Sequence, residues 1–238
     1  MFFCLPALLS RVRIGLSSIV VAFILAWTPA LARASGAASP ASVTVCIQPL
    51  GPYNPKLARV AAKGIRYLFG FKVVTQKRRA LPRSAYYPPR KRYRADKLLD
   101  WMAAVVVPAN RDCRIVLGFT RVDISTTKGR YKDWGIFGLG SLEQAVAVVS
   151  SHRLTRSRNR RKTGRRIVNV VNHELGHVLG LPHYTCPHKH CLMESAHGTI
   201  NTVDTESGLL CPESIATIER RHHVDLPERK RFDWRKVL

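Results

Sequence analysis

Acidic residues are scarce in this sequence. Aspartate and glutamate together number 15 against 39 lysines and arginines, so the 238-residue chain has a formal net charge of +24. Such a charge favours anionic partners, for example cell-wall polymers, lipid headgroups, acidic proteins or nucleic acid, without naming one. Many basic residues lie in short runs near proline or serine, at 77–79, 90–92 and 156–166. Runs of this kind are typical of solvated loops.

Sequence features that would indicate several other classes of protein are absent. The basic runs are not accompanied by a specific nucleic-acid-binding motif, and the sequence has no internal repeat. Beyond the N-terminal region, no apolar stretch approaches the roughly 20 residues that cross a bilayer. The hydrophobic share of 46% is nevertheless that of an ordinary globular protein, which argues against a disordered chain.

The N-terminal residues resemble an export signal. Arg11 and Arg13 precede an apolar run and a stretch of small residues, with cleavage sites after Ala32 or Ala34. We therefore expect export to the periplasm or cell exterior, with an uncleaved membrane anchor as the alternative. The expected division of the chain is a signal peptide over 1–34, a linker over 35–41 and a catalytic domain over 42–238, with lobes 42–180 and 181–238.

The remaining sequence alternates between strand and helix patterns. Alternating apolar and β-branched residues predict strands, and apolar residues three or four apart predict amphipathic helices. The expected strands are 42–50, 71–76, 113–124 and 145–151, with a glycine-rich edge segment at 134–140, and the expected helices are 54–69, 95–106, 163–179 and 212–221. Residues 77–94 are expected to form a basic loop, and 184–212 show little regular pattern. This order indicates an α/β lobe.

The predicted helix 163–179 carries His173, Glu174 and His177 among apolar residues. Histidines four apart on a helix point to the same side, where both imidazoles can reach one metal ion. Glu174 lies at the flank of that face, so its carboxylate can hold a water molecule without ligating the metal. The pair of histidines alone is a weak signal, because a buried histidine often bonds a backbone carbonyl instead.

The residues that follow this helix strengthen the interpretation of a metal site. Gly180 lets the chain turn after the helix, and His183, three residues later, can supply a third ligand. Three neutral nitrogens with one open position are typical of a catalytic Zn²⁺. Met193 suits a turn that places an apolar floor beneath the ligands.

The pattern His-Glu-x-x-His-x-x-Gly-x-x-His followed by a methionine turn is the metzincin motif. Downstream, the chain resembles archaemetzincins, which place cysteines and the turn methionine at the intervals found here in Cys186, Cys191, Met193 and Cys211. The resemblance implies a zincin fold, with a mixed twisted sheet, a central active-site helix and a smaller irregular C-terminal subdomain. It also implies a zinc metallopeptidase acting on peptides or proteins, often as an aminopeptidase.

The cysteines depart from the family pattern. Tyr184 and Thr185 separate the third histidine from Cys186, and Ser214 replaces the fourth cysteine. Two outcomes remain open for Cys186, Cys191 and Cys211. They can hold a second, structural zinc with His188, His190 or His197 as fourth ligand, or two of them can form a disulfide.

Cys46 and Cys113 form a separate question. The resemblance places them on neighbouring strands of the sheet, where a disulfide between them would leave three cysteines for zinc. Two buried free thiols are an equal alternative.

In metzincins the substrate lies extended beside the edge strand above the active-site helix. The resemblance assigns this role to residues 135–139, which are Gly135, Ile136, Phe137, Gly138 and Leu139. An alternative from another class is a catalytically inert zinc protein that binds anionic partners through its basic surface. A third hypothesis is an inhibited enzyme in which Tyr184, His188 or His190 approaches the metal. The oligomeric state is not indicated.

Overall fold

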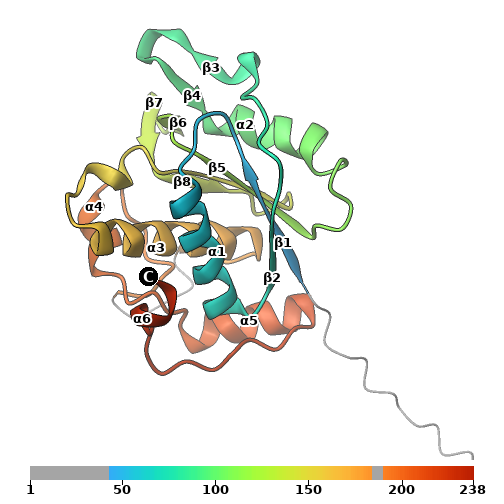
Figure 1. Ribbon diagram of the computed structural model, residues 1–238, viewed down its shortest axis with the longest axis vertical. Coiled ribbons are helices and arrows are strands. Elements are labelled where there is room, and N and C mark those ends of the chain that lie inside the picture. Colours follow the sequence, from blue (N-terminus) through green and yellow to red (C-terminus); the bar gives the residue numbers. More distant parts are fainter. Residues whose placement is uncertain (1–42, 184–189) are drawn as a thin grey trace, which may run out of the picture. The chain divides into compact units, whose positions relative to one another are not determined.

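A five-stranded sheet forms the centre of the computed structural model, which describes residues 43–183 and 190–238 (Figure 1). Its strand order is β2-β1-β5-β9-β8, with β1, β2, β5 and β9 parallel and β8 antiparallel at the edge. The strands are β1 (Thr44–Pro49), β2 (Lys72–Thr75), β5 (Ile115–Thr120), β8 (Gly138–Gly140) and β9 (Val146–Ser150). The mixed sheet expected from the resemblance is thus confirmed.

A second sheet has four strands in the order β3-β4-β6-β7. Its strands are β3 (Tyr86–Tyr87), β4 (Arg92–Arg94), β6 (Ile124–Lys128) and β7 (Tyr131–Ile136). The prediction that 77–94 is only a loop is therefore wrong in part. β4 is three residues long and gains its strand conformation by pairing with β6, some thirty residues later, so local periodicity could not reveal it.

The helices cover both faces of the central sheet. They are α1 (Pro55–Phe69), α2 (Ala95–Trp101), α3 (Arg160–Val178), α4 (Ile200–Thr205), α5 (Pro212–His222) and α6 (Trp234–Val237). α1 and α3 pack together on one face, and α2, continued by a π-helical turn at Met102–Val106, lies on the other. Because both faces are covered, β5 and β9 are buried along their whole length.

Two of the helices, α1 and α3, begin at an asparagine cap. The Asn54 carboxamide oxygen accepts bonds from the backbone N–H groups of Lys56 and Leu57, with Pro55 at the first helical position. Asn159 caps α3 in the same way, so that helix begins three residues before the predicted Thr163. The other predicted helices agree with the structure within a turn, but the short helices α4 and α6 were not predicted.

The prediction of one strand over residues 113–124 is wrong. β5 ends at Thr120, and the chain turns at Arg121 before entering the second sheet as β6. The Arg121 backbone N–H donates to the carbonyl of Pro52, a long-range contact with no local signature. The glycine-rich segment 134–140 likewise divides at Phe137, since β7 belongs to the second sheet and β8 to the edge of the first.

The C-terminal residues pack on the same core as the sheet. Leu192, Met193, Val203, Phe232 and Val237 belong to the apolar cluster that α1 and α3 form on the sheet. The Tyr67 and Phe232 rings contact each other at a tilt of 52°, with centroids 4.7 Å apart, which holds the last residues against α1. In the described ranges no helix is long and apolar enough to cross a membrane. The predicted signal peptide and linker, residues 1–41, lie outside the described residues.

Candidate active site

The three histidines of the motif converge. The Nε2 atoms of His173, His177 and His183 lie 3.1 Å from one another in every pair. His173 and His177 come from α3, and His183 follows the turn at Gly180, whose φ of 91° is a conformation that glycine adopts readily. These three residues are the group of potential metal ligands found in the part of the chain that the structure describes.

Hydrogen bonds orient two of the rings. The Nδ1–H of His173 donates to the carbonyl of Leu192 (2.6 Å), and the Nδ1–H of His177 donates to that of Leu181 (2.8 Å). Each Nε2 is then left as a lone-pair donor. Burial lowers the pKa of His173 to about 3 and that of His183 to about 4, and it also lowers the pKa of His177. All three rings are therefore neutral, as metal ligation requires.

The donor set fits zinc. Three nitrogens bound at about 2.0–2.1 Å to a tetrahedral ion stand roughly 3.3 Å apart, close to the separations seen here. Three converging lone pairs have no proton to share, so a cation on their common side satisfies them all. Met193 is fully buried, and a Cβ on Gly176 would come within 2.4 Å of its sulfur. The close contact places Met193 against α3, the helix that carries His173 and His177.

Glu174 lies beside the histidines and is 7% exposed. Burial raises the pKa of its carboxyl to about 8, partly offset by a hydrogen bond from the Gly140 backbone. Strand β8 approaches very closely here. A Cβ on Gly138 would lie 2.6 Å from the Glu174 side chain, and one on Gly140 would lie 2.3 Å from its backbone oxygen. The two glycines therefore let the edge strand lie against the active-site helix.

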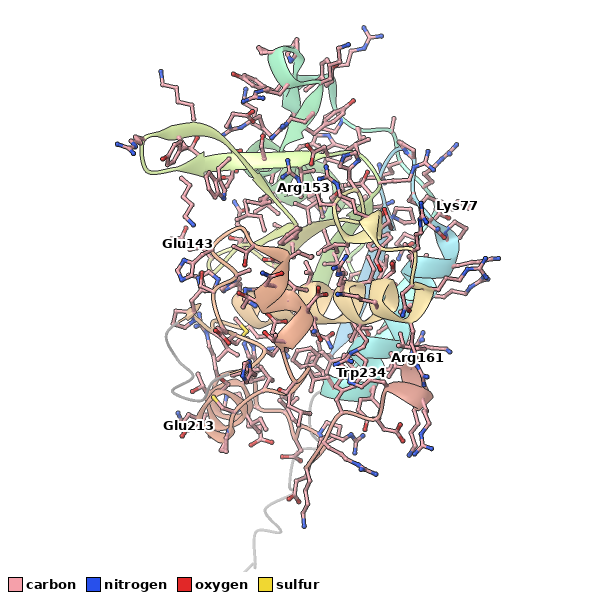
Figure 2. The ribbon with its side chains drawn as sticks, turned by 90° about the vertical axis from the view of Figure 1, so that its left-hand side faces the viewer. Lys77, Glu143, Arg153, Arg161, Glu213 and Trp234 are labelled. Carbon is pink, nitrogen blue, oxygen red and sulfur yellow. A yellow bond between two sulfur atoms is a disulfide. The ribbon has the colours of Figure 1, made fainter. Side chains whose placement is uncertain are left out.

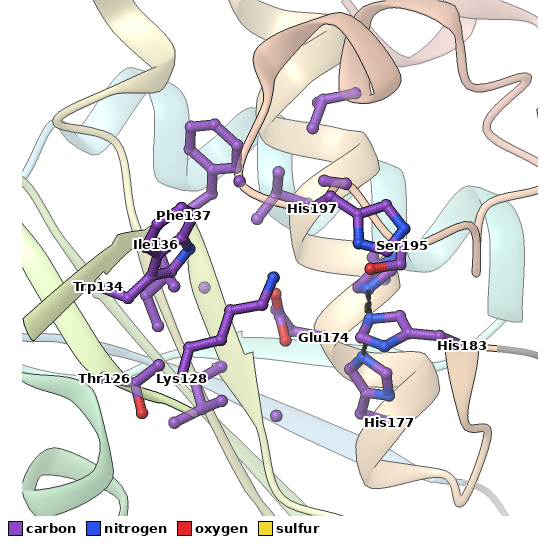
Figure 3. A pocket seen from close by; sticks show the side chains of 18 of the residues that line it. Thr126, Lys128, Trp134, Ile136, Phe137, Glu174, His177, His183, Ser195 and His197 are labelled. Atoms are coloured by element: carbon purple, nitrogen blue, oxygen red, sulfur yellow. Dashed lines mark hydrogen bonds between the residues drawn. The ribbon is translucent and has the colours of Figure 1, made fainter. Parts of the chain in front are cut away.

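A cavity of about 440 Å³ opens at this group. Figure 3 shows Glu174 between Ile136 and Phe137 on one side of the cavity and His177, His183, Ser195 and His197 on the other. Ile136, Phe137, Gly138 and Leu139 of the predicted substrate segment line the cavity, together with Gly140. Gly135 is not among its lining residues. A Cβ on Gly135 would meet the Arg153 guanidinium instead.

Several cavity residues were missed in the sequence. Thr126, Lys128 and Trp134 come from the β6–β7 hairpin, and Val170, Val203 and Glu206 form another part of the wall. The Lys128 ammonium lies 5.3 Å from the centre of the Trp134 ring. No spacing rule connects these positions to the histidine motif. The alternating glycines at 138 and 140 were the one local signal of a close approach.

The cysteines behave differently from the histidines. A disulfide joins Cys46 of β1 to Cys113, which lies two residues before the neighbouring strand β5, and this decides between the two outcomes left open for them. Cys191 is also disulfide-bonded, and so offers no thiolate to a metal in this state. Cys211 is a buried free thiol whose sulfur lies 3.2 Å from the Ser214 hydroxyl. Cys186 lies outside the described residues.

The histidines proposed as further ligands are not grouped with Cys211 in a metal-binding cluster within the described ranges. His197 lines the active-site cavity, and its charge lowers the pKa of His183. His190 is exposed, donates its backbone N–H to Glu194 and does not line the cavity. Tyr184 and His188 lie outside the described residues.

Fold and site together define a zinc metallopeptidase of the metzincin type. The sequence model of Peptidase family M54 matches residues 57–220. The archaemetzincin of Haloarcula marismortui is 30% identical over 175 residues, which cover 70% of this chain and 94% of the relative. This chain belongs to peptidase family M54, the archaemetzincins.

Two solved structures of archaemetzincins share this fold. The archaemetzincin of Archaeoglobus fulgidus superposes with a TM-score of 0.62 at 27% identity, covering 74% of this chain and 99% of that one. The archaemetzincin of Methanopyrus kandleri gives 0.64 at 26% identity, covering 76% and 95%. The alternative of a catalytically inert binding protein is not favoured, because the family consists of zinc-dependent peptidases and Glu174 lies beside the ligands.

Proposed function

We propose that this protein is an exported zinc-dependent peptidase in which Glu174 is the general base, and that it removes residues from peptide N-termini. The observation that carries the proposal is the position of Glu174, which lies in the cavity beside the three histidines but outside the ligand group. A carboxylate in this place can move a proton without competing for the metal.

A zinc ion held by His173, His177 and His183 would polarise the scissile carbonyl and lower the pKa of a water molecule from 15.7 to about 7. Glu174, whose carboxyl the charge of such an ion would keep ionised despite its burial, would take the proton from this water and deliver it to the leaving amine. Among the described residues, β8 is the last strand of its sheet on the side away from β9, where an extended peptide can add backbone hydrogen bonds. Such bonds position a substrate with little dependence on its sequence.

A peptide library tests the reaction. Hydrolysis should occur with the zinc-loaded protein and disappear with a chelator, and mass spectrometry should find cleavage near free N-termini and little near acetylated ones. Equal cleavage of acetylated peptides at internal bonds would make the protein an endopeptidase. Absence of cleavage in both arms would overturn the peptidase proposal.

Export is supported by two features. A signal-like stretch precedes residue 35, and the Cys46–Cys113 disulfide is typical of proteins in oxidising compartments. Fractionation of the source cells should find the protein outside the cytoplasm, with a mature N-terminus at Arg33 or Ser35. Recovery of the intact N-terminus in the membrane fraction would instead indicate an anchor.

The positive surface supports contact with anionic polymers or surfaces outside the cell. Lys77 and Arg161, labelled in Figure 2, lie on the side away from Glu143, which follows the cavity-lining strand β8. Retention on an anionic resin should therefore fall steeply with added salt while peptide cleavage continues.

A further inference from the structure

A second buried carboxylate lines the active-site cavity. Glu206 is 2% exposed, and its Oε2 atom has no hydrogen-bond partner in the described part of the chain. A buried carboxylate oxygen is normally bonded, because an unpaired one costs several kcal/mol of desolvation. The unpaired oxygen therefore points to a group that the described residues do not supply.

The position of Glu206 is held by tertiary contacts. The residue directly follows α4, and its backbone N–H donates to the carbonyl of Thr202. α4 is fastened to α3 because the Arg166 guanidinium donates to both carboxylate oxygens of Asp204, at 2.6 and 2.7 Å. The Asn169 side chain also donates to the carbonyl of Val203 at 2.9 Å. The carboxylate thus lies on a rigid part of the cavity wall.

The neighbouring charges make Glu206 unfavourable as an isolated anion. Burial, together with the negative charges of Glu194 and Glu174, raises the pKa of Glu206 to about 9. The one lysine that lines the cavity, Lys128, lies over Trp134 and makes no ion pair with Glu206 in the described structure. The free protein keeps this carboxyl protonated at neutral pH, and a cation brought by a ligand would favour its ionised form and pair with the oxygen.

The adjoining wall is apolar. Val170 and Val203 are both nearly fully buried and line the same cavity as Glu206, together with Phe137. An aliphatic wall that includes one carboxylate complements a side chain with a long apolar stem and a charged end, as in lysine or arginine.

We propose that Glu206 is a specificity residue that binds a cationic nitrogen of the peptide substrate in this cavity, either a lysine or arginine side chain or the free α-amino group. This inference rests on the proposed peptidase function. An uncharged substrate would leave the carboxylate unpaired, and sites built around buried polar groups reject such analogues.

Matched peptides test the inference with the zinc-loaded full-length protein. The two peptides of a pair differ at one position, where one has lysine and the other norleucine, and a separate pair is made for each position. Each peptide is made with a free and with an acetylated N-terminus. The wild type should favour a cationic member by tenfold or more in kcat/KM, and Glu206→Gln should bring that ratio close to one. The exposed Glu228 gives the control variant Glu228→Gln, which should keep the wild-type ratio.

The test depends on the ratio of kcat/KM between the two peptides of a pair, because partial unfolding of the variant lowers kcat/KM for both peptides alike. A lysine preference that persists after acetylation assigns the site to a side chain, and a preference for free N-termini alone assigns it to the α-amino group. Cleavage without any charge preference, or with one that Glu206→Gln leaves intact, overturns the inference and leaves the peptidase proposal standing.

If no peptide is cleaved, the peptidase proposal fails. A measurement of peptide binding then tests the inference about Glu206. Fluorescence anisotropy of the same peptides on Glu174→Gln should then show tenfold tighter binding of a cationic member, lost in Glu174→Gln/Glu206→Gln. Equal affinities would overturn it.

Discussion

Glu174 and Glu206 line the same cavity and are both nearly buried, at 7% and 2% exposure. Burial raises the pKa of both carboxyls, to about 8 and about 9. Their partners differ. Glu174 receives a backbone hydrogen bond from Gly140, whereas Glu206 has an oxygen without a partner among the described residues and two negative neighbours.

The comparison shows that burial alone does not assign a role to a carboxylate. Glu174 lies within the helical turn that presents His173 and His177, so its chemistry is tied to the metal ligands. Glu206 directly follows a different helix, α4, and the apolar side chains of Val170 and Val203 line the same cavity. We propose proton transfer for the first carboxylate and substrate recognition for the second.

The largest effect should come from Glu174→Gln. The amide cannot accept a proton, so kcat should fall by about 10²–10⁴-fold while the zinc content stays unchanged. Peptide hydrolysis and elemental analysis of the same sample measure the two quantities. Loss of zinc together with activity would indicate that Glu174 is itself a metal ligand, like the three histidines.

Gly140→Ala should act through the position of Glu174. The new Cβ would lie 2.3 Å from the Glu174 backbone oxygen, so either the edge strand or α3 must shift. A displacement of about 1 Å can cost up to 10²-fold in rate, and we expect roughly a 10- to 100-fold loss in kcat/KM.

Gly129→Ala is the matched control for this glycine. Its φ is 55°, and a Cβ there would meet nothing within 4 Å. The control should therefore cost about 1 kcal/mol of stability and little activity. Equal losses of activity in both variants would show that the close approach of β8 to Glu174 does not control the activity.

Glu206→Gln should change how stability depends on pH. The folded pKa of about 9 lies above the usual 4.5, so the folded protein holds a proton that the unfolded chain releases. Stability is therefore lost as pH rises from about 4.5 toward 9, by at most about 1.4 kcal/mol per pH unit. Thermal unfolding between pH 5 and 9, without peptide, should show a smaller decline for the variant. Parallel curves would contradict the raised pKa.

The smallest effect is expected for Cys211→Ser. Cys191 is already disulfide-bonded, and the nearest recorded polar partner of the Cys211 sulfur is the Ser214 hydroxyl. We expect one zinc per chain before and after the substitution, measured against protein concentration. Two zincs in the wild type, falling to one in the variant, would establish a second metal site.

Local patterns predicted much of the fold. Helices α1, α3 and α5 follow from apolar spacing and from Pro55 and Pro212 at first-turn positions, and β1, β2 and β9 follow from β-branched runs. The errors have one cause in common. The short strand β4, the turn at Arg121 and the helix α4 all depend on contacts with segments distant in the sequence.

The amino-acid order by itself determined the metal ligands. A four-residue helical spacing followed by a glycine turn brings His173, His177 and His183 together through local chain geometry, and the same turn of helix carries Glu174. The tertiary structure alone decided what surrounds them. Strand β8 reaches Glu174 through sheet pairing, and α4 brings Glu206 to the cavity through Arg166 and Asn169. Such long-range contacts form only when the whole core packs, so no short stretch of sequence records them.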